Sequence, residues 1–302
     1  MNKVNAYLTE DFLDCCELSL CSFLDRYGYE YRYLFNRNWC LKDANLFEEN
    51  MKIHNDYIYI DRANFWEELK NIFGINTIWH FNALGTYLQS NDNLILHLVD
   101  AKFLPWMKVY FNRESAEHYI YIDNFDKQLN KFYVIDLKLN FREWVDSEII
   151  YSAYTSMGRR TFEYTNPEYK TNQKNLKNSE KEAYKSITKI KKFLYELKRC
   201  EESYLLNIQN ILTFRIKQVI EVKLSFVEFL KIINDHKGKN LILQKECLST
   251  VNYWKTLRTY LMKGKIRNQY DLEKINSIAD NILESELKVL SLFDCRGFNY
   301  VD

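Results

Sequence analysis

The sequence contains little proline and glycine, with two prolines and seven glycines among 302 residues. This scarcity excludes collagen-like, proline-rich and flexible-linker architectures, and it leaves most turns to Asn and Asp. The chain also lacks a run of about eighteen apolar residues, which a membrane-spanning helix needs. Its first residues, MNKVNAYLTEDF, do not resemble a secretion signal. We therefore expect a cytoplasmic protein that makes no contact with a membrane.

The usual motifs of metal and nucleotide sites are missing as well. Seven cysteines form no CxxC pair, and the five histidines are not grouped at metal-ligand spacing. The sequence contains no GxxxxGK or GxGxxG loop to bind phosphates. It thus predicts neither a metal nor a cofactor, and the absence of paired cysteine motifs fits a reducing compartment.

What the chain has in excess is aromatic residues, and its charge is unevenly distributed. With 23 tyrosines, 19 phenylalanines and 47% hydrophobic residues, it can build one large domain or two modest ones. The net charge of +1 combines 15 basic and 23 acidic side chains in residues 1–150 with 27 basic and 18 acidic ones in residues 151–302. Because the acidic half repels phosphate, we expect no nucleic-acid partner.

The first half has the pattern of a mixed α+β domain. Apolar spacing predicts a helix over residues 8–28, with Thr9 and Asp11 as N-terminal caps and Gly28 at its end. A second helix is predicted over 64–73. Short aromatic and β-branched runs then predict three strands, at 94–100, 118–123 and 131–136.

The second half has only helical spacing. Apolar residues recur by threes and fours from 187 to 212, with a kink or break near Glu201, and further helices are predicted over about 217–235, 244–262 and 271–293. Asp271 is the expected cap of the last helix. A polar segment around Pro167 separates the halves. We therefore expect one domain over 1–165 and a helical domain over 175–302.

Three residues of the first half suggest nucleophilic catalysis. A hairpin symmetric about Lys127 would place His118 directly opposite Asp136, so that the carboxylate orients the imidazole. Cys15 and Cys16 fall early in the first predicted helix, where the helix dipole favours a thiolate. Taken singly, each residue is more often structural: a core cysteine, a buried histidine or a turn-forming aspartate.

Four blocks of sequence follow one another in an order that resembles a known family. These are DCCELSLCSFLDRYGYEYRYLF, VDAKFLPWMKVYFN, HYIYIDNFD and KFYVID, within residues 8–145. They resemble the papain-like cysteine enzymes typified by the N-terminal domain of butirosin biosynthesis protein H, acyltransferases of antibiotic assembly lines. The resemblance implies a papain-like α+β fold, followed here by an all-helical region.

Carried over residue by residue, the resemblance makes Cys16 the nucleophile, His118 the base and Asp136 the orienting carboxylate, with Cys15 as the alternative nucleophile. It implies transfer of an acyl or peptidyl chain from the phosphopantetheine thioester of a carrier protein to an amine such as a diamine or amino sugar. During the transfer the acyl or peptidyl chain is bound to the enzyme as an acyl-cysteine, and no nucleotide is consumed. Trp106 and Tyr119 are the expected substrate-binding residues.

One departure from the papain pattern concerns the oxyanion hole. Papain-like hydrolases usually place a Gln shortly before the Cys, but residues 6–14 contain neither Gln nor Asn. The backbone N–H of Cys16 is one expected donor, and the second donor remains unassigned.

Other functions remain open at the level of sequence. The same triad serves cysteine peptidases and thioesterases, and the fold is also compatible with a non-catalytic scaffold. The basic cluster KSITKIKK at 185–192 is a candidate docking surface for an acidic carrier protein. The same cluster also has a plainer explanation: it is the solvated face of a long helix, or it attracts the oppositely charged first half of the chain.

Overall fold

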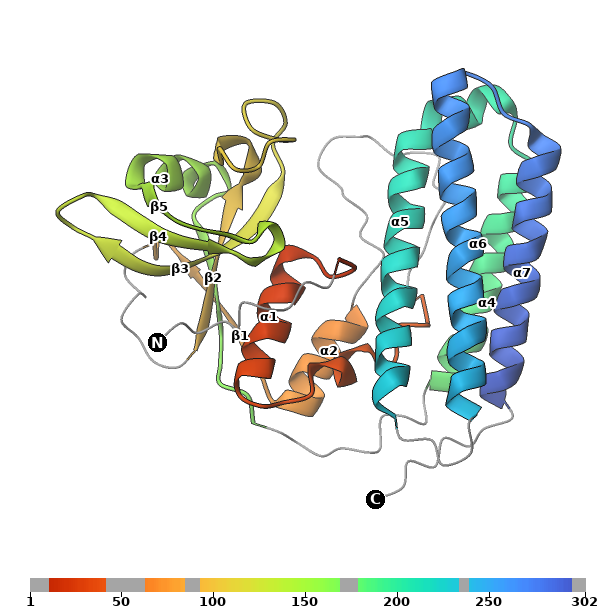
Figure 1. Ribbon diagram of the computed structural model, residues 1–302, viewed down its shortest axis with the longest axis horizontal. Helices are drawn as coiled ribbons and strands as arrows, with labels where there is room; N and C mark the ends of the chain where they lie inside the picture. The colour runs from red at the N-terminus through yellow and green to blue at the C-terminus, as the bar shows by residue number, and fades with distance from the viewer. Residues whose placement is uncertain (1–10, 42–62, 85–92, 169–178, 234–238, 295–302) are drawn as a thin grey trace. The chain divides into compact units, whose positions relative to one another are not determined.

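The structure is a computed structural model that describes residues 11–41, 63–84, 93–168, 179–233 and 239–294. Its contacts divide the chain into two units, Met1–Tyr31 with Leu69–Lys170 and Arg32–Glu68 with Thr171–Asp302. The first unit holds a six-stranded sheet and the second holds long helices (Figure 1). The α+β class expected from the sequence is therefore confirmed.

The sheet of the first unit is antiparallel, with strand order β1-β6-β2-β3-β4-β5. The predicted strands are present as β2, β3 and β4, whereas β1, β5 and β6 were not predicted. The six strands are β1 Thr77–Phe81, β2 Leu94–Asp100, β3 Glu117–Asp126, β4 Lys131–Asp136, β5 Phe141–Asp146 and β6 Arg160–Tyr164.

Two helices cover opposite faces of this sheet. Helix α3, Ser147–Ser156, adds Ile150 and Tyr154 to a buried cluster that contains Ile120 and Ile122 of β3. Helix α1, Cys15–Arg26, lies on the other face, since Cys16 contacts Tyr164, which shares the face of Tyr119 by strand register. The first turn of α1 lies next to the start of β3, where the N–H of Tyr119 contacts Cys15.

The β3–β4 hairpin has a different register from the predicted one. Tyr121 pairs with Ile135 and Ile122 with Val134, and a bulge at Asp123 then shifts the pairing. The same register places Asp136 opposite Ile120, so the predicted direct pairing of His118 with Asp136 is wrong. His118 lies two residues along from that position, on the same face, as a diagonal neighbour of Asp136.

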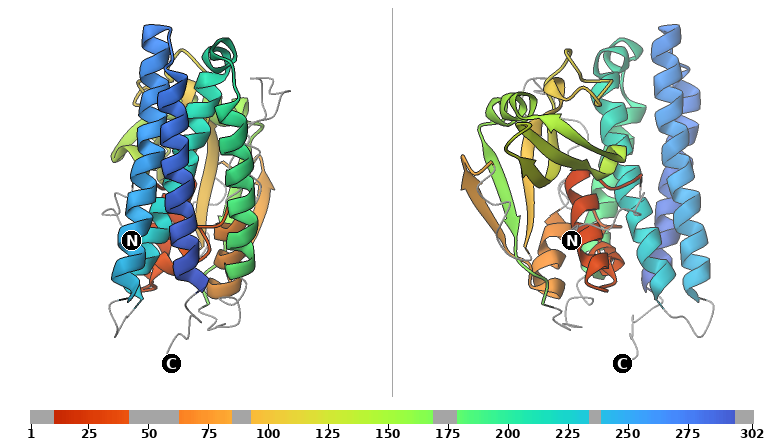
Figure 2. Two further views of the ribbon diagram at one scale, coloured as in Figure 1. Left: turned by 90° about the vertical axis from the view of Figure 1, so that its right-hand side faces the viewer. Right: turned by 60° about the vertical axis from the view of Figure 1, so that its left-hand side comes forward.

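The second unit contains four long helices that run side by side (Figures 1 and 2). Helix α5 packs against α6, α6 against α7, and α4 against α7. The predicted break near Glu201 is present, but the predicted separation of 187–212 from 217–235 is wrong, because α5 is continuous. None of the described helices is long and apolar enough to cross a membrane. The bounds are α4 Ser179–Lys198, α5 Glu202–Ile232, α6 Lys239–Arg267 and α7 Leu272–Asp294.

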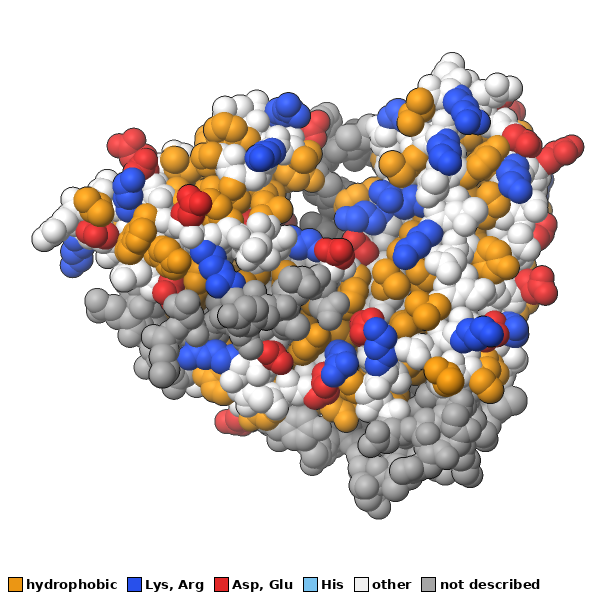
Figure 3. Space-filling model, viewed as in Figure 1, with side chains coloured by type: hydrophobic (Ala, Val, Ile, Leu, Met, Phe, Trp, Pro, Cys, Tyr) orange, Lys and Arg blue, Asp and Glu red, His pale blue; other side chains and the backbone are white. Residues whose placement is uncertain are grey.

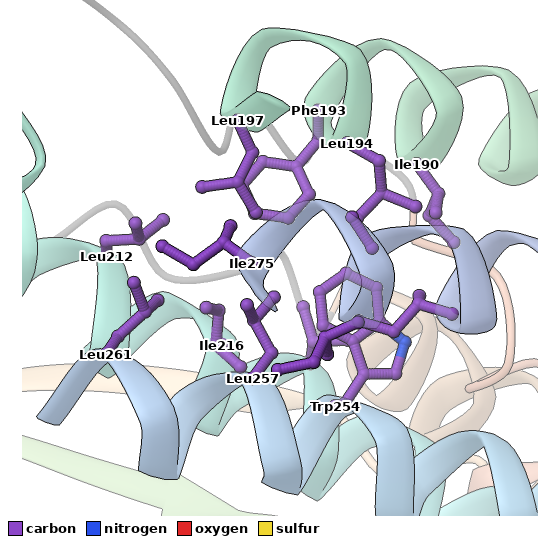
Figure 4. Close-up of a cluster of buried hydrophobic side chains, with 14 of the residues drawn as sticks. Ile190, Phe193, Leu194, Leu197, Leu212, Ile216, Trp254, Leu257, Leu261 and Ile275 are labelled. Carbon is purple, nitrogen blue, oxygen red and sulfur yellow. The ribbon is translucent and has the colours of Figure 1, made fainter. Parts of the chain in front are cut away.

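Apolar side chains spaced by threes and fours fill the centre of these helices, as Figure 4 shows for Phe193, Trp254 and Leu261 among others. Residues before the helices join the same core. The ring of Trp39 packs against Phe226 with centroids 5.8 Å apart, and Leu41 is a member of the core cluster. Residues 32–68, which the sequence assigned to the domain over 1–165, therefore group with the helical unit. Helix α2, Ala63–Phe73, spans the division between the units.

A fully buried ion pair lies within the helical unit. Lys223 Nζ of α5 lies 2.8 Å from Glu286 Oε1 and 3.0 Å from Oε2 of α7. Trp254 Nε1 donates to Glu286 Oε1 at 2.8 Å, and the ammonium lies 3.7 Å from the ring centroid of Trp39. Each charged atom therefore has partners, which is the condition under which burial of an ion pair is tolerated.

We expect Glu286→Gln to lower the free energy of unfolding by about 3–5 kcal/mol, because Lys223 then stays buried without a counter-charge. The double substitution Lys223→Met with Glu286→Leu removes both charges and should cost much less. Urea unfolding of the three proteins measures the difference. A double variant as unstable as Glu286→Gln would contradict this account of the pair.

Candidate active site

Helix α1 begins at Cys15, and the residues around its first turn form a capping box. Asp14 Oδ1 accepts from the N–H of Glu17 at 2.8 Å, and Glu17 Oε2 accepts from the N–H of Asp14 at 3.0 Å. The prediction that the helix starts near residue 8 with Asp11 as a cap is wrong, because the box at Asp14 fixes a later start. Thr9 lies outside the described residues. Gly28 closes the helix in a left-handed conformation, as predicted.

This start makes Cys15 the first residue of the helix, and its thiol faces the proposed base. The Sγ atom of Cys15 accepts from the N–H of Tyr119 at 3.4 Å, and the electrostatic interaction with Cys15 is the largest of the influences that raise the pKa of the neighbouring His118. Cys15 is half-buried. Cys15 therefore lies beside His118 at the positive end of the helix dipole.

Cys16 has a different environment from the one expected for a nucleophile. Its side chain is 4% exposed, and its Sγ lies 3.3 Å from the hydroxyl of Tyr164. Burial, followed by the carboxylate of Asp14, raises the pKa of the Cys16 thiol well above its ordinary value. The structure therefore places Cys15, the alternative nucleophile of the sequence analysis, and not Cys16 beside His118.

His118 and Asp136 form a buried pair. His118 Nε2 lies 2.7 Å from Asp136 Oδ2. Since Nε2 is occupied by the carboxylate, Nδ1 is the nitrogen that remains for the Cys15 thiol. Burial alone lowers the pKa of His118, but the charge of Cys15 and the contact with Asp136 raise it to about 10. For Asp136 burial has the opposite effect and raises the pKa, but the hydrogen bond with His118 brings the pKa of Asp136 below its usual value.

Trp106 is a further partner of the same carboxylate. Its Nε1 donates to Asp136 Oδ2 at 2.9 Å, and its ring stacks on Phe141 at 4.1 Å between centroids. Trp106 and His118 thus contact the same oxygen of Asp136. Trp106 supports Asp136 directly, whereas the sequence assigned it to substrate.

Tyr119 is the second residue that the sequence analysis expects to bind substrate. Its ring packs edge-on against Phe162 at 5.3 Å. Burial, followed by the charge of Cys16, raises the pKa of the Tyr119 hydroxyl, so it remains protonated. With Tyr164 it forms an aromatic surface beside the first turn of α1.

Lys138 connects the end of β4 with the segment before α1. Its Nζ donates to the backbone carbonyls of Asp11 at 2.9 Å and Leu13 at 2.7 Å. Because Lys138 follows Asp136 by two residues, this contact ties the carboxylate to the start of the cysteine helix. The sequence analysis did not identify Lys138, since nothing in its local pattern shows a partner so far away along the chain.

Asp100 is a second residue that sequence analysis missed, although it begins one of the resemblance blocks. It is fully buried, and burial alone raises its pKa, but its hydrogen bonds bring the pKa below the ordinary value. These bonds fix both ends of the loop that carries Trp106. The donors are Lys102 N at 3.0 Å, Ser115 Oγ at 2.8 Å, Ala116 N at 3.2 Å and Ser156 Oγ at 2.8 Å.

A scan against protein-family models gives no match, and no curated protein matches the chain. Within the described residues, no group of three or more His, Cys, Asp and Glu side chains is placed to hold a metal ion.

The geometry predicts that Cys15 is the most reactive thiol of the protein. At about pH 6 the protonated His118 lies beside the Cys15 sulfur, whereas burial raises the pKa of the Cys16 thiol, so iodoacetamide should modify Cys15 first and Cys16 slowly. His118→Gln should slow this reaction by at least about tenfold at about pH 6 and by much less at about pH 10, where a thiol ionises unaided. Peptide mass spectrometry after timed labelling measures both sites. Preferential labelling of Cys16 would overturn the assignment.

Trp106→Phe tests the support of Asp136, because it removes the N–H donor and keeps an aromatic ring against Phe141. Loss of a hydrogen bond to a charged group costs about 1.5–3 kcal/mol. We expect a lower free energy of unfolding and a higher pKa of Asp136, because the Trp106 N–H is one of the donors that lower this pKa; carbon NMR of the carboxyl group detects the change. Trp144→Phe, an exposed indole on β5, is the matched control. An unchanged titration of Asp136 would show that Trp106 does not act on the pair.

Proposed function

We propose that the protein is a cysteine-dependent acyltransferase with a papain-like catalytic unit. The observation that carries this proposal is the grouping of the Cys15 thiol, His118 and Asp136 at the first turn of α1. A helix that presents the cysteine, packed on an antiparallel sheet that presents the histidine and the carboxylate, is the arrangement that papain-like enzymes use. The order Cys, His, Asp along the chain is also theirs.

In the first step the Cys15 thiolate attacks the carbonyl carbon of an acyl thioester. A bond forms between this carbon and Sγ, and the bond from the carbon to the donor sulfur breaks. The departing sulfur takes the proton of the His118 imidazolium, which leaves His118 neutral. Exchange of one thioester for another is nearly isoenergetic, so this step needs no nucleotide.

In the second step a neutral amine attacks the acyl-cysteine. Its nitrogen bonds to the carbonyl carbon, the carbon–Sγ bond breaks, and His118 takes the proton that the nitrogen loses. The thiolate of Cys15 and the imidazolium of His118 are thereby restored. Because an amide is more stable than a thioester, the reaction runs toward transfer wherever an amine is bound and water is excluded.

The first turn of α1 supplies donors for the developing oxyanion. The Leu18 N–H bonds to the Asp14 carbonyl, and the Glu17 N–H bonds to the Asp14 carboxylate. Helix geometry offers no acceptor within the helix to the N–H groups of Cys15 and Cys16. The N–H of Cys15, on the attacking residue itself, is the donor we assign to the oxyanion.

The substrates follow from the charge of the two parts of the chain and from the resemblance. The unit that carries the site, residues 1–31 with 69–170, has 18 acidic and 13 basic side chains, and this acidic excess attracts a cationic amine such as a diamine or an amino sugar. The donor is an acyl or peptidyl chain on the phosphopantetheine of a carrier protein, as in the assembly lines that make antibiotics. Hydrolysis by the same triad is the competing reaction, and only the acceptor differs.

An acyl thioester should leave an acyl group on Cys15. Intact-protein mass spectrometry with a small acyl thioester is expected to show one adduct, mapped to Cys15 by peptide analysis. Cys15→Ala and His118→Ala should abolish it, whereas Cys16→Ser should keep it. A polyamine added afterwards should remove the adduct as an amide. Release of free acid alone, whatever amine is offered, would favour a hydrolase, and the absence of any adduct would support a scaffold.

A further inference from the structure

A basic groove runs along the helical unit between α6 and α7. Its volume is about 460 Å³, and α7 contributes Lys274 and Ile278 to it. The remaining lining residues come from α6: Asn252, Lys255, Thr256, Thr259, Tyr260 and Lys263. These six positions are separated by threes and fours or are adjacent to such positions, so they form one stripe along one face of the helix. Lys255 and Lys263 lie two turns apart, which is about 12 Å along the axis.

The chemistry of this groove is that of an anion site. Its polar side chains can donate hydrogen bonds through three ammonium groups, two threonine hydroxyls, a tyrosine hydroxyl and an amide. No Asp or Glu is among the described residues that line it. Tyr260 and Ile278 add apolar surface, which a bare inorganic ion does not use.

Several lysines of the helical unit pair with carboxylates, whereas the lysines of the groove form no ion pair with the described residues. Elsewhere Lys198 pairs with Asp280, and Lys288 pairs with Glu246 at 2.9 Å. Among the described residues none forms an ion pair with Lys255, Lys263 or Lys274, and all three are exposed. Figure 3 shows Lys and Arg side chains over the surface formed by α5 and α6. The positive charge of the groove is therefore uncompensated.

We propose that this groove docks an acidic helix of a partner protein. A partner helix lying along the groove between two helices can place carboxylates two turns apart, which matches the spacing of Lys255 and Lys263. Its apolar positions would then meet the half-buried Tyr260, above the buried Ile278. The cationic residues that line the groove are all lysines. Without the planar guanidinium of an arginine, they suit dispersed carboxylates better than bidentate recognition of a phosphate. This partner is the carrier protein if the proposed function holds, and its identification as a carrier protein rests on that function.

The groove replaces the docking surface expected at residues 185–192. In α4 two positions of that stretch, Ile187 and Ile190, are buried in core clusters. Lys192 lies 3.8 Å from Glu196 within the same helix. The stretch thus presents a solvated helix face, and the uncompensated, concave surface lies on α6 and α7.

Binding of a fluorescently labelled acidic acyl carrier protein, followed by anisotropy, tests the proposal. Charge reversal of Lys255, Lys263 and Lys274 to Glu should weaken binding by at least about tenfold at low salt. The matched control reverses three exposed lysines of α4, Lys185, Lys191 and Lys192, and should change the dissociation constant by less than about twofold. Equal weakening by both triple variants, no weakening by the first, or no binding by the natural chain would each overturn the proposal.

Two further measurements separate this proposal from neighbouring ones. Inorganic pyrophosphate or duplex DNA that displaces the carrier protein at a similar concentration would show a general anion site and overturn docking of a protein helix. Acylation of Cys15 in the natural chain by a small thioester, which needs no carrier, tests the proposed function alone. Groove-dependent binding without acylation of Cys15 would support the docking surface and contradict the proposed transferase. Acylation of Cys15 without groove-dependent binding would contradict the docking surface alone.

Discussion

The position at which α1 begins is the constraint on which the candidate site depends. The capping box between Asp14 and Glu17 fixes the start of the helix, so that Cys15 occupies the first helical position. A start one residue later or earlier would turn a different side chain toward His118, because successive helical residues point about 100° apart. The dipole, the backbone N–H groups and the thiol all converge at this point for the same geometric reason.

The other half of the site depends on a bulged hairpin and its supports. His118 reaches Asp136 diagonally, and this is possible because the bulge at Asp123 shifts β3 against β4. Trp106 and Lys138 then connect the carboxylate to a loop and to the segment before α1. Each of these contacts joins parts of the chain that are distant in sequence, so the site is a product of the whole first unit.

Much of the fold could be predicted from sequence because its signals are local. The runs at 94–100 and 131–136 gave the bounds of β2 and β4 because their β-branched and aromatic residues are continuous. The strand β1 was missed because its residues, TIWHF, are short and largely exposed at a sheet edge. In the site, the types and order of the Cys, His and Asp were visible, but the choice between Cys15 and Cys16 depends on a cap. The roles of Trp106 and Lys138 depend on tertiary contacts, which have no local pattern.

The central claim is that His118 is an imidazolium that pairs with Asp136 and lies beside Cys15. Nitrogen NMR of the histidine rings at about pH 8 tests it most directly, since an unperturbed imidazole is neutral there. The pair predicts that both ring nitrogens of His118 carry protons at this pH, and that Cys15→Ser lowers the pH at which one proton is lost. A His118 that titrates near about pH 6.5, with or without Cys15, would contradict the account.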